Sequence, residues 1–269
     1  MRSKKIKAAR RKMSRDKRQH QKPARQSAAA STEKILACVS TGEIFQPIRL
    51  HYKVSDTDRL VNAFARLRCI DYDSELRRWV WLYSAEATEL QFKNQPDTEA
   101  PIVIGEFLLK GSNAAVLNVL SVERAIKAAP FFDRYIARDV AEVTHITIIN
   151  KLFSVEEVLS IERLDQLFER SDIIVRKPEA IMGKLLEIKA GTDNKLERLA
   201  AFGQFVTELA SEPEPEIEKF PAYYYEDGIE SLNLALRQRQ FVALEHWKGN
   251  TNYTAMDAIR EFVTKIEGG

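Results

Sequence analysis

The first 26 residues hold the densest group of side chains with an evident chemistry. Twelve lysines and arginines and one acid, Asp16, give residues 1–26 a formal charge of +11. Such a density of cations binds a polyanion by releasing the counterions condensed on its phosphates. We therefore expect binding to nucleic acid, RNA or DNA, through phosphate contacts that do not read sequence. The expected contact residues are Lys4, Lys5, Lys7, Arg10, Arg11, Lys12, Arg15, Lys17 and Arg18.

Other targets for the basic segment stay open. An acidic protein, the acidic remainder of the chain and an anionic membrane surface are alternatives, as is a solvated terminus that aids assembly or solubility. Membrane binding favours Trp, Phe or Leu among the cations, and residues 1–26 contain none of these. The stretch RRKMSRDKR is also similar to a nuclear-import cluster, which matters if the source is eukaryotic.

A second candidate site is the stretch RRWVWLY at residues 77–83. In a strand, Arg77, Trp79, Trp81 and Tyr83 would share one face. Aromatic rings among cations on an open sheet stack nucleotide bases, at ~1–3 kcal/mol per base. We therefore include Arg77, Trp79 and Trp81 among the expected nucleic-acid contacts. The competing interpretation is that the aromatic face forms the core, as large aromatic side chains usually do.

A third candidate is an acid followed about fifteen residues later by an acid-x-Lys triplet. Asp172, Glu187 and Lys189 have this spacing, which resembles the PD-(D/E)xK nuclease pattern. In that pattern, paired carboxylates hold a divalent metal and the lysine helps to activate water. The nuclease hypothesis requires a strand at residues 185–189. The local pattern favours a helix instead, because Pro178 and Gly191 have the positions typical of helix ends.

No other motif points to catalysis, a metal or a cofactor. The two cysteines, Cys38 and Cys69, form no CxxC pair, which argues against a zinc site and a disulfide scaffold. The dinucleotide, P-loop and nucleophile-elbow glycine motifs are absent. The histidines have no metal-binding spacing; they are His20, His51, His145 and His246. We therefore expect a non-enzymatic protein without a cofactor or a bound metal.

The elements that would position these residues form an α+β fold. Residues 48–54 alternate between apolar and cationic side chains, so we expect a half-buried strand with Arg49, His51 and Lys53 on its outer face. Further strands are expected within 68–83, at 102–109 and at about 143–149. Helices are expected at 55–67, at 112–129 before Pro130, and from the capping box Ser154–Glu157. This β-α-β-β-α-β order is ferredoxin-like and predicts a small antiparallel sheet with helices on one face.

The chain divides into three parts by composition. Residues 1–32 lack core-forming side chains and are expected to be a disordered basic tail. Residues 33–176 form the expected α/β domain, and residues 177–269 a helical region. That region contains helices at 178–191, 194–210, 231–247 and 254–266, with an acidic linker at 211–221 and the cluster AYYYED at 222–227.

These patterns predict a nucleic-acid-associated protein with a protein partner at its C-terminal helices. The residues after 26 carry a formal charge of −9, so the basic segment is attached to an acidic body. No apolar stretch is long enough to cross a membrane, and the cysteine content suits the cytoplasm, or the nucleus of a eukaryote. A protein-interaction or scaffold subunit is one alternative, which exposed apolar residues on the C-terminal helices would favour. A metal-dependent nuclease is the other.

Overall fold

The computed structural model describes residues 34–96, 100–192, 194–211, 215–258 and 260–261. The chain divides between Lys34 and Ile35, and every helix and strand named below lies in the unit Ile35–Gly269. The expected disordered tail therefore falls outside the described residues. Among the helices described, none combines the length and the apolar composition that a membrane span requires.

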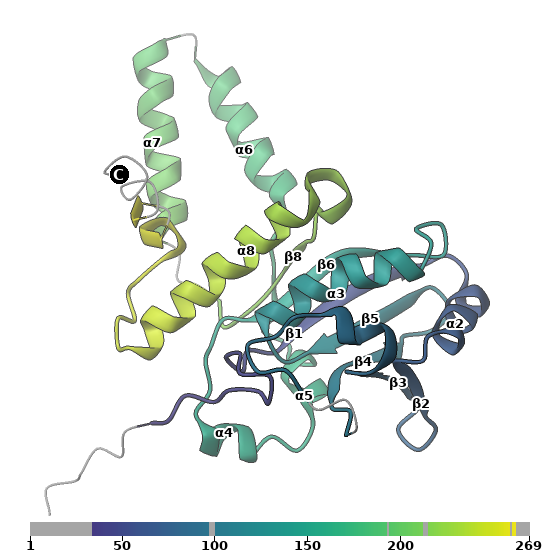
Figure 1. The fold of residues 1–269 in the computed structure, drawn as a ribbon. Helices are drawn as coiled ribbons and strands as arrows, with labels where there is room; N and C mark the ends of the chain where they lie inside the picture. Colours follow the sequence, from purple (N-terminus) through teal and green to yellow (C-terminus); the bar gives the residue numbers. More distant parts are fainter. Residues whose placement is uncertain (1–33, 97–99, 193, 212–214, 259, 262–269) are drawn as a thin grey trace, which may run out of the picture. The chain divides into compact units, whose positions relative to one another are not determined.

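An eight-stranded mixed sheet organises this unit (Figure 1). The order across the sheet is β2-β3-β4-β5-β1-β6-β8-β7, with β7 and β8 parallel and the other neighbours antiparallel. The fold is α+β, as expected, but the sheet is large and mixed rather than small and antiparallel. The strands are β1 (Ile48–Val54), β2 (Ile70–Asp73), β3 (Arg78–Leu82), β4 (Val103–Leu109), β5 (Ala114–Val119), β6 (Ala141–Ile149), β7 (Ile174–Val175) and β8 (Ile217–Pro221).

Helices follow strands in an order that the ferredoxin-like prediction does not reproduce. Two strands, β4 and β5, stand between β3 and the long helix that follows, and two further strands come after β6. The helical elements are α2 (Thr57–Arg66), η2 (Ala85–Glu89), α3 (Val122–Tyr135), α4 (Val155–Leu159), α5 (Leu164–Phe168), α6 (Pro178–Gly191), α7 (Lys195–Ser211) and α8 (Tyr224–Trp247). In Figure 1, α3 and α8 lie next to each other over the sheet, and their residues contact one another.

The expected helix at 112–129 is wrong in its first half. Ala114–Val119 form β5 in the middle of the sheet, where β4 and β1 flank it and five of its six residues are buried. A strand buried on both faces lacks the alternation that identifies strands in a sequence. The helix begins after Ser121, whose hydroxyl accepts a hydrogen bond from the Arg124 amide at 3.2 Å. Pro130 lies inside α3 and does not end it.

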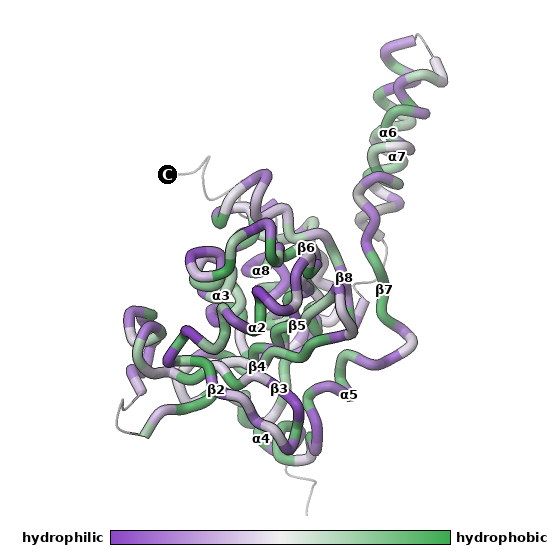
Figure 2. The backbone as a smooth tube through the Cα atoms, turned by 90° about the vertical axis from the view of Figure 1, so that its right-hand side faces the viewer, coloured by the Kyte–Doolittle hydropathy of each residue, from purple (hydrophilic) through white to green (hydrophobic). Residues whose placement is uncertain are grey.

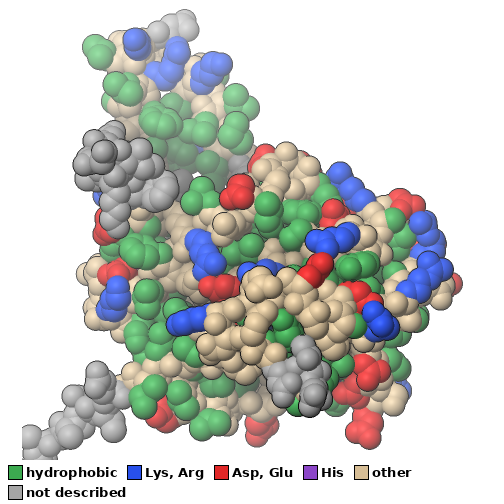
Figure 3. Space-filling model, in the orientation of Figure 1, with side chains coloured by type: hydrophobic (Ala, Val, Ile, Leu, Met, Phe, Trp, Pro, Cys, Tyr) green, Lys and Arg blue, Asp and Glu red, His purple; other side chains and the backbone are tan. Residues whose placement is uncertain are grey.

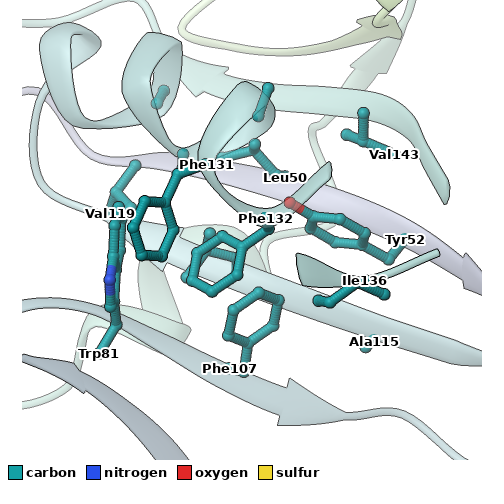
Figure 4. Packing of buried hydrophobic residues seen from close by; sticks show 14 of the residues in the cluster. Leu50, Tyr52, Trp81, Phe107, Ala115, Val119, Phe131, Phe132, Ile136 and Val143 are labelled. Atoms are coloured by element: carbon teal, nitrogen blue, oxygen red, sulfur yellow. The ribbon is translucent and has the colours of Figure 1, made fainter. Parts of the chain in front are cut away.

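The main core lies between the sheet and the helices α2, α3 and α8. Trp81, Phe107 and Phe132 lie at its centre with their rings close together (Figure 4). Gly105 pairs with Trp81 across β3 and β4, and a Cβ atom at this position would lie 3.0 Å from the indole ring. The absence of a side chain at residue 105 therefore allows the Trp81 ring to lie against the neighbouring strand.

The second face of the sheet is also partly covered by helices, so the expected placement of all helices on one face is wrong. A smaller apolar cluster contains Phe45, Phe153, Phe168 and Ile217, with α4 and α5 around it. The capping box predicted at Ser154 and Glu157 is present at the start of α4. Helix α5 covers part of this face, because its Asp165 pairs with Arg49 of β1.

The C-terminal part contains a strand where the sequence predicts only a linker and helices. Ile217–Pro221 form β8, which pairs with β6 and extends the sheet. Helices α6 and α7 match their predicted bounds closely and lie side by side in both views (Figures 1 and 2). Helix α8 starts at Tyr224 and is kinked at Gly228, where φ is 81°. Of the expected helix at 254–266, residues 255–258 and 260–261 are helical, and 262–266 lie outside the described residues.

Candidate functional site

The predicted phosphate contacts between Lys4 and Arg18 lie outside the described residues. The expectation that these residues bind nucleic acid therefore stays a prediction from the sequence. The described part of the chain contains the other candidates: the aromatic strand, the nuclease pattern, and groups that the sequence did not single out.

The aromatic residues of β3 do not form an open face beside the cations of β1. Trp81 is fully buried and packs against Phe131 and Phe132, with ring centroids 5.2 and 4.8 Å away. Trp79 is half-buried between Phe64 and Tyr72, with centroid distances of 5.4 and 4.8 Å. Both rings belong to the core face, so Trp81 has no free ring surface on which a base could stack. The competing interpretation, an aromatic face that forms the core, is the one that the packing supports.

The arginines next to these rings differ in position. Arg77 is not part of the strand: it lies in the turn before β3, exposed, with a left-handed φ of 51°. Arg78 lies on the second face, where its guanidinium pairs with Glu106 at 2.6 Å and with Asp73 at 3.3 Å. Arg77 therefore remains an exposed cation, whereas Arg78 is held by two carboxylates.

The polar side of β1 is largely covered. Arg49 is buried under α5, where it donates to Asp165 at 2.8 Å and to Asn118 at 2.8 Å, and its guanidinium lies 4.6 Å from the Phe168 ring centroid. A buried arginine needs such a partner because an unpaired buried charge is strongly destabilising. This ion pair fixes α5 to the sheet and withdraws Arg49 from any ligand.

His51 lies on the same face and has an unusual titration. Its Nε2 is 2.8 Å from the Thr147 hydroxyl. Burial, together with the positive charges of Lys219 and Arg49, lowers the pKa of His51 to about 3. His51 is therefore neutral at physiological pH, which suits a structural histidine rather than a phosphate contact.

The nuclease hypothesis requires a strand at residues 185–189, and the structure contradicts it. Residues 185–189 belong to the helix α6, and Glu187 pairs with Lys184 at 3.2 Å. Asp172 is held by Arg170, at 3.0 Å from its Nε. A helix places Glu187 and Lys189 on different faces. Within the described ranges, no three His, Cys, Asp or Glu side chains come together in a way that could hold a metal ion.

A cavity of about 400 Å³ lies beside β8 and α8, and no pattern in the sequence predicts it. Its floor is Glu218, which is 2% exposed. Arg239 holds Glu218 through two hydrogen bonds of 2.7 and 2.9 Å, and Arg176 adds a third of 3.1 Å. The Arg239 guanidinium also lies 3.9 Å from the centroid of Phe220. Burial acts to raise the pKa of Glu218, but the two guanidinium groups outweigh it and hold the pKa below its usual value.

Exposed apolar side chains gather on α6 and α7. Figure 3 shows hydrophobic side chains over this helix pair. The hydropathy along both helices is mixed rather than divided into two clear faces (Figure 2). The exposed residues are Met182, Leu186, Leu196, Leu199 and Phe202. Exposed apolar groups of this size suit contact with another protein.

By contrast, two of the three tyrosines of the AYYYED cluster pack inward, while Tyr223 is exposed. Tyr224 and Tyr225 contact the main core, and the Tyr225 ring lies 4.2 Å from the Arg138 guanidinium. These two tyrosines therefore pack the segment after β8 onto the folded body.

Comparisons with protein-family models, with curated protein sequences and with solved structures find no match to this chain.

Proposed function

We propose that this protein associates with nucleic acid through its basic N-terminal segment and has no catalytic activity of its own. The observation that carries the proposal is the division of charge: +11 in residues 1–26 against −9 in the remainder. A net charge near zero for the whole chain conceals this contrast. Twelve cations in so short a segment attract a phosphate backbone irrespective of base sequence.

The folded unit supports this role by repelling phosphate rather than binding it. Its excess of acids makes the body a poor surface for nucleic acid. Several of its arginines, including Arg49, Arg78 and Arg239, are already engaged by carboxylates. The body then contributes a protein contact, for which the exposed apolar residues of α6 and α7 are the candidate surface. The proposed location is the cytoplasm, or the nucleus if the source is eukaryotic.

A second candidate function is that of a protein-interaction subunit that contacts nucleic acid only incidentally. The observation that favours it is the group of exposed apolar side chains on α6 and α7. The two functions differ in the role of the basic segment. Only the first requires residues 1–26 for activity, because there the nucleic acid is the principal partner.

Removal of the basic segment tests the proposal. Fluorescence anisotropy with labelled RNA and DNA duplexes and single strands would compare the full chain with a chain that starts at residue 33. We expect at least a hundred-fold loss of affinity at low salt, since the contacts to phosphate are lost. A matched control replaces Arg68, an exposed arginine of the body that is not among the expected contacts, with Gln, and should change little. Retained affinity in the shortened chain would move the binding site to the body.

A further inference from the structure

Helices α6 and α7 lack the packing that stabilises the other long helices of the unit. None of their described residues belongs to either apolar cluster, and none of their described side chains is buried. Helices of 14 and 17 residues normally depend on an apolar face that packs against other parts of a protein. The two helices contact each other, but apolar side chains of α6 remain exposed. Within the described part of the chain, nothing covers them.

The exposed face of α6 is a short stripe with an apolar middle and opposite charges at its ends. Its residues follow one another at helical intervals of three, four and three positions, so they lie on one side of the helix; they are Glu179, Met182, Leu186 and Lys189. Met182 is 55% exposed and Leu186 is 59% exposed. Glu179 lies in the first turn and Lys189 in the last turn. We refer to these four residues as the α6 stripe.

The order of its residues makes the α6 stripe complementary to an antiparallel copy of itself. A two-fold axis at the middle of the stripe would place Glu179 of each copy opposite Lys189 of the other. The same axis would place Met182 of each copy opposite Leu186 of the other. Opposite charges and apolar groups would therefore meet their own kind of partner throughout. A parallel copy would instead bring like charges together, which is unfavourable.

The charged residues of α6 differ in whether they are already paired. On the other side of the helix, Lys184 donates to Glu187 at 3.2 Å. Among the described residues, no ion pair engages Glu179 or Lys189 of the stripe. These two groups can therefore pair with a second copy without first breaking an ion pair within the chain.

We propose that two copies of this chain associate through the α6 stripe, antiparallel across a two-fold axis, with an ion pair between Glu179 and Lys189 on each side of an apolar centre. A stable dimer buries roughly 800 Å² on each copy. One stripe supplies only part of this area, so the exposed Leu199 and Phe202 of α7 would supply more. This inference rests on the protein contact in the proposed function and names its partner as a second copy; it does not depend on the basic segment.

Sedimentation velocity of the nuclease-treated full chain tests self-association in the absence of nucleic acid. We expect a reversible dimer at ~10 μM protein, and a chain that stays monomeric up to ~100 μM would overturn the proposal. Nucleic-acid binding is measured separately by anisotropy. A failure of self-association can therefore be told from a failure of the proposed nucleic-acid function.

Charge reversal within the stripe tests whether the partner is a second copy. Glu179→Lys makes both ends of the stripe positive, and Lys189→Glu makes both ends negative. Each variant alone should dimerise at least ~ten-fold more weakly, because two attractive pairs become two repulsive pairs. An equal mixture of the two variants should regain the original affinity to within ~three-fold, because each pair across the axis is again of opposite charge.

Matched controls lie on the other side of the same helix. Glu187→Lys and Lys184→Glu make the same changes of charge at exposed positions outside the stripe and should alter dimerisation by less than ~two-fold. Circular dichroism and the thermal midpoint would show whether each variant folds. If a charge variant does not fold, Leu186→Gln removes the apolar centre without a change of charge and should weaken the dimer by ~five-fold. Undiminished dimerisation of a folded stripe variant, or a mixture of folded charge variants that stays monomeric, would overturn the proposal.

Discussion

His51 illustrates how a single partly buried residue makes the stability of this fold depend on pH. The side chain is neutral in the folded state, with a pKa lowered to about 3 by burial, against ~6.5 in an unfolded chain. Between these two values the unfolded state binds more protons than the folded state. The free energy of unfolding therefore rises with pH across this window and falls as the solution is acidified.

We expect stability to fall by up to ~1.4 kcal/mol for each pH unit below 6.5, as far as His51 controls it. Urea unfolding at several pH values between 4 and 7 measures this slope. Replacement of His51 with Asn removes the titrating group and should flatten the slope. A variant with the slope of the original protein would show that His51 is not the group responsible.

Trp81 provides a test of the packing that excludes it from ligand binding. Trp81→Ala removes a fully buried ring from between Phe131 and Phe132 and should lower the free energy of unfolding by ~3–5 kcal/mol. Trp81→Phe keeps apolar volume and removes an indole N–H that has no partner among the described residues, so its effect should be much smaller. Urea unfolding gives both values. If Trp81→Phe weakened nucleic-acid binding while the protein remained folded, the result would favour base stacking on Trp81 and contradict a purely structural role.

Glu218 and Glu216 are a matched pair, two residues apart in the chain. Glu218 is buried between Arg176 and Arg239, whereas Glu216 is exposed and pairs with the exposed Arg170. Glu218→Gln removes the carboxylate that the partly buried Arg239 guanidinium binds and should reduce stability by ~3–5 kcal/mol. Glu216→Gln should change stability by less than ~1 kcal/mol. Thermal unfolding of both variants checks the difference, and equal effects would contradict the assigned role of Glu218.

At the scale of elements, alternation in the sequence predicted the bounds of strand β1 to the residue, but not the covering of Arg49 and His51 on its outer face. Its apolar side chains face the main core and its cations face the other side, as period-two patterning requires. The same method failed for β5, which is nearly all buried and therefore does not alternate. The prediction that the helix ends before Pro130 was also wrong. The packing of α3 on the sheet tolerates a proline that would break an isolated helix.

The cavity beside β8 could not be predicted from the sequence at all. Its charged floor depends on contacts between Glu218, Arg239 and Asn150, which are 21 and 68 residues apart along the chain. Such pairing is determined by the sheet order and by the position of α8, and neither leaves a local signal. The strand itself lies in a stretch whose prolines and acids are typical of a linker.

The helix pair α6 and α7 yields a prediction about partners. Leu199→Glu together with Phe202→Lys would remove exposed apolar area without disturbing the main core, because neither residue belongs to it. We expect little change in thermal stability and a loss of self-association or partner binding, measured by analytical ultracentrifugation and by crosslinking. A control, Leu234→Glu on α8, should leave these contacts intact. A large loss of stability instead would identify these side chains as part of the fold.

At the scale of the whole molecule, the central feature is a strongly basic segment attached to an acidic body. Residues 1–26 carry +11 and the rest of the chain −9. If the segment holds phosphates as proposed, its affinity must depend steeply on salt, because each contact releases condensed counterions. Any affinity of the body alone for nucleic acid should depend very little on the salt concentration.

The most direct test is therefore the salt dependence of binding to a DNA duplex by the full chain. Each engaged phosphate contributes about −0.9 to the slope of log K against log salt concentration, so engagement of half of the twelve cations predicts a slope near −5. Replacement of all twelve with Gln should bring the slope close to zero. A shallow slope for the full chain, or a steep one that survives the replacement, would contradict the account.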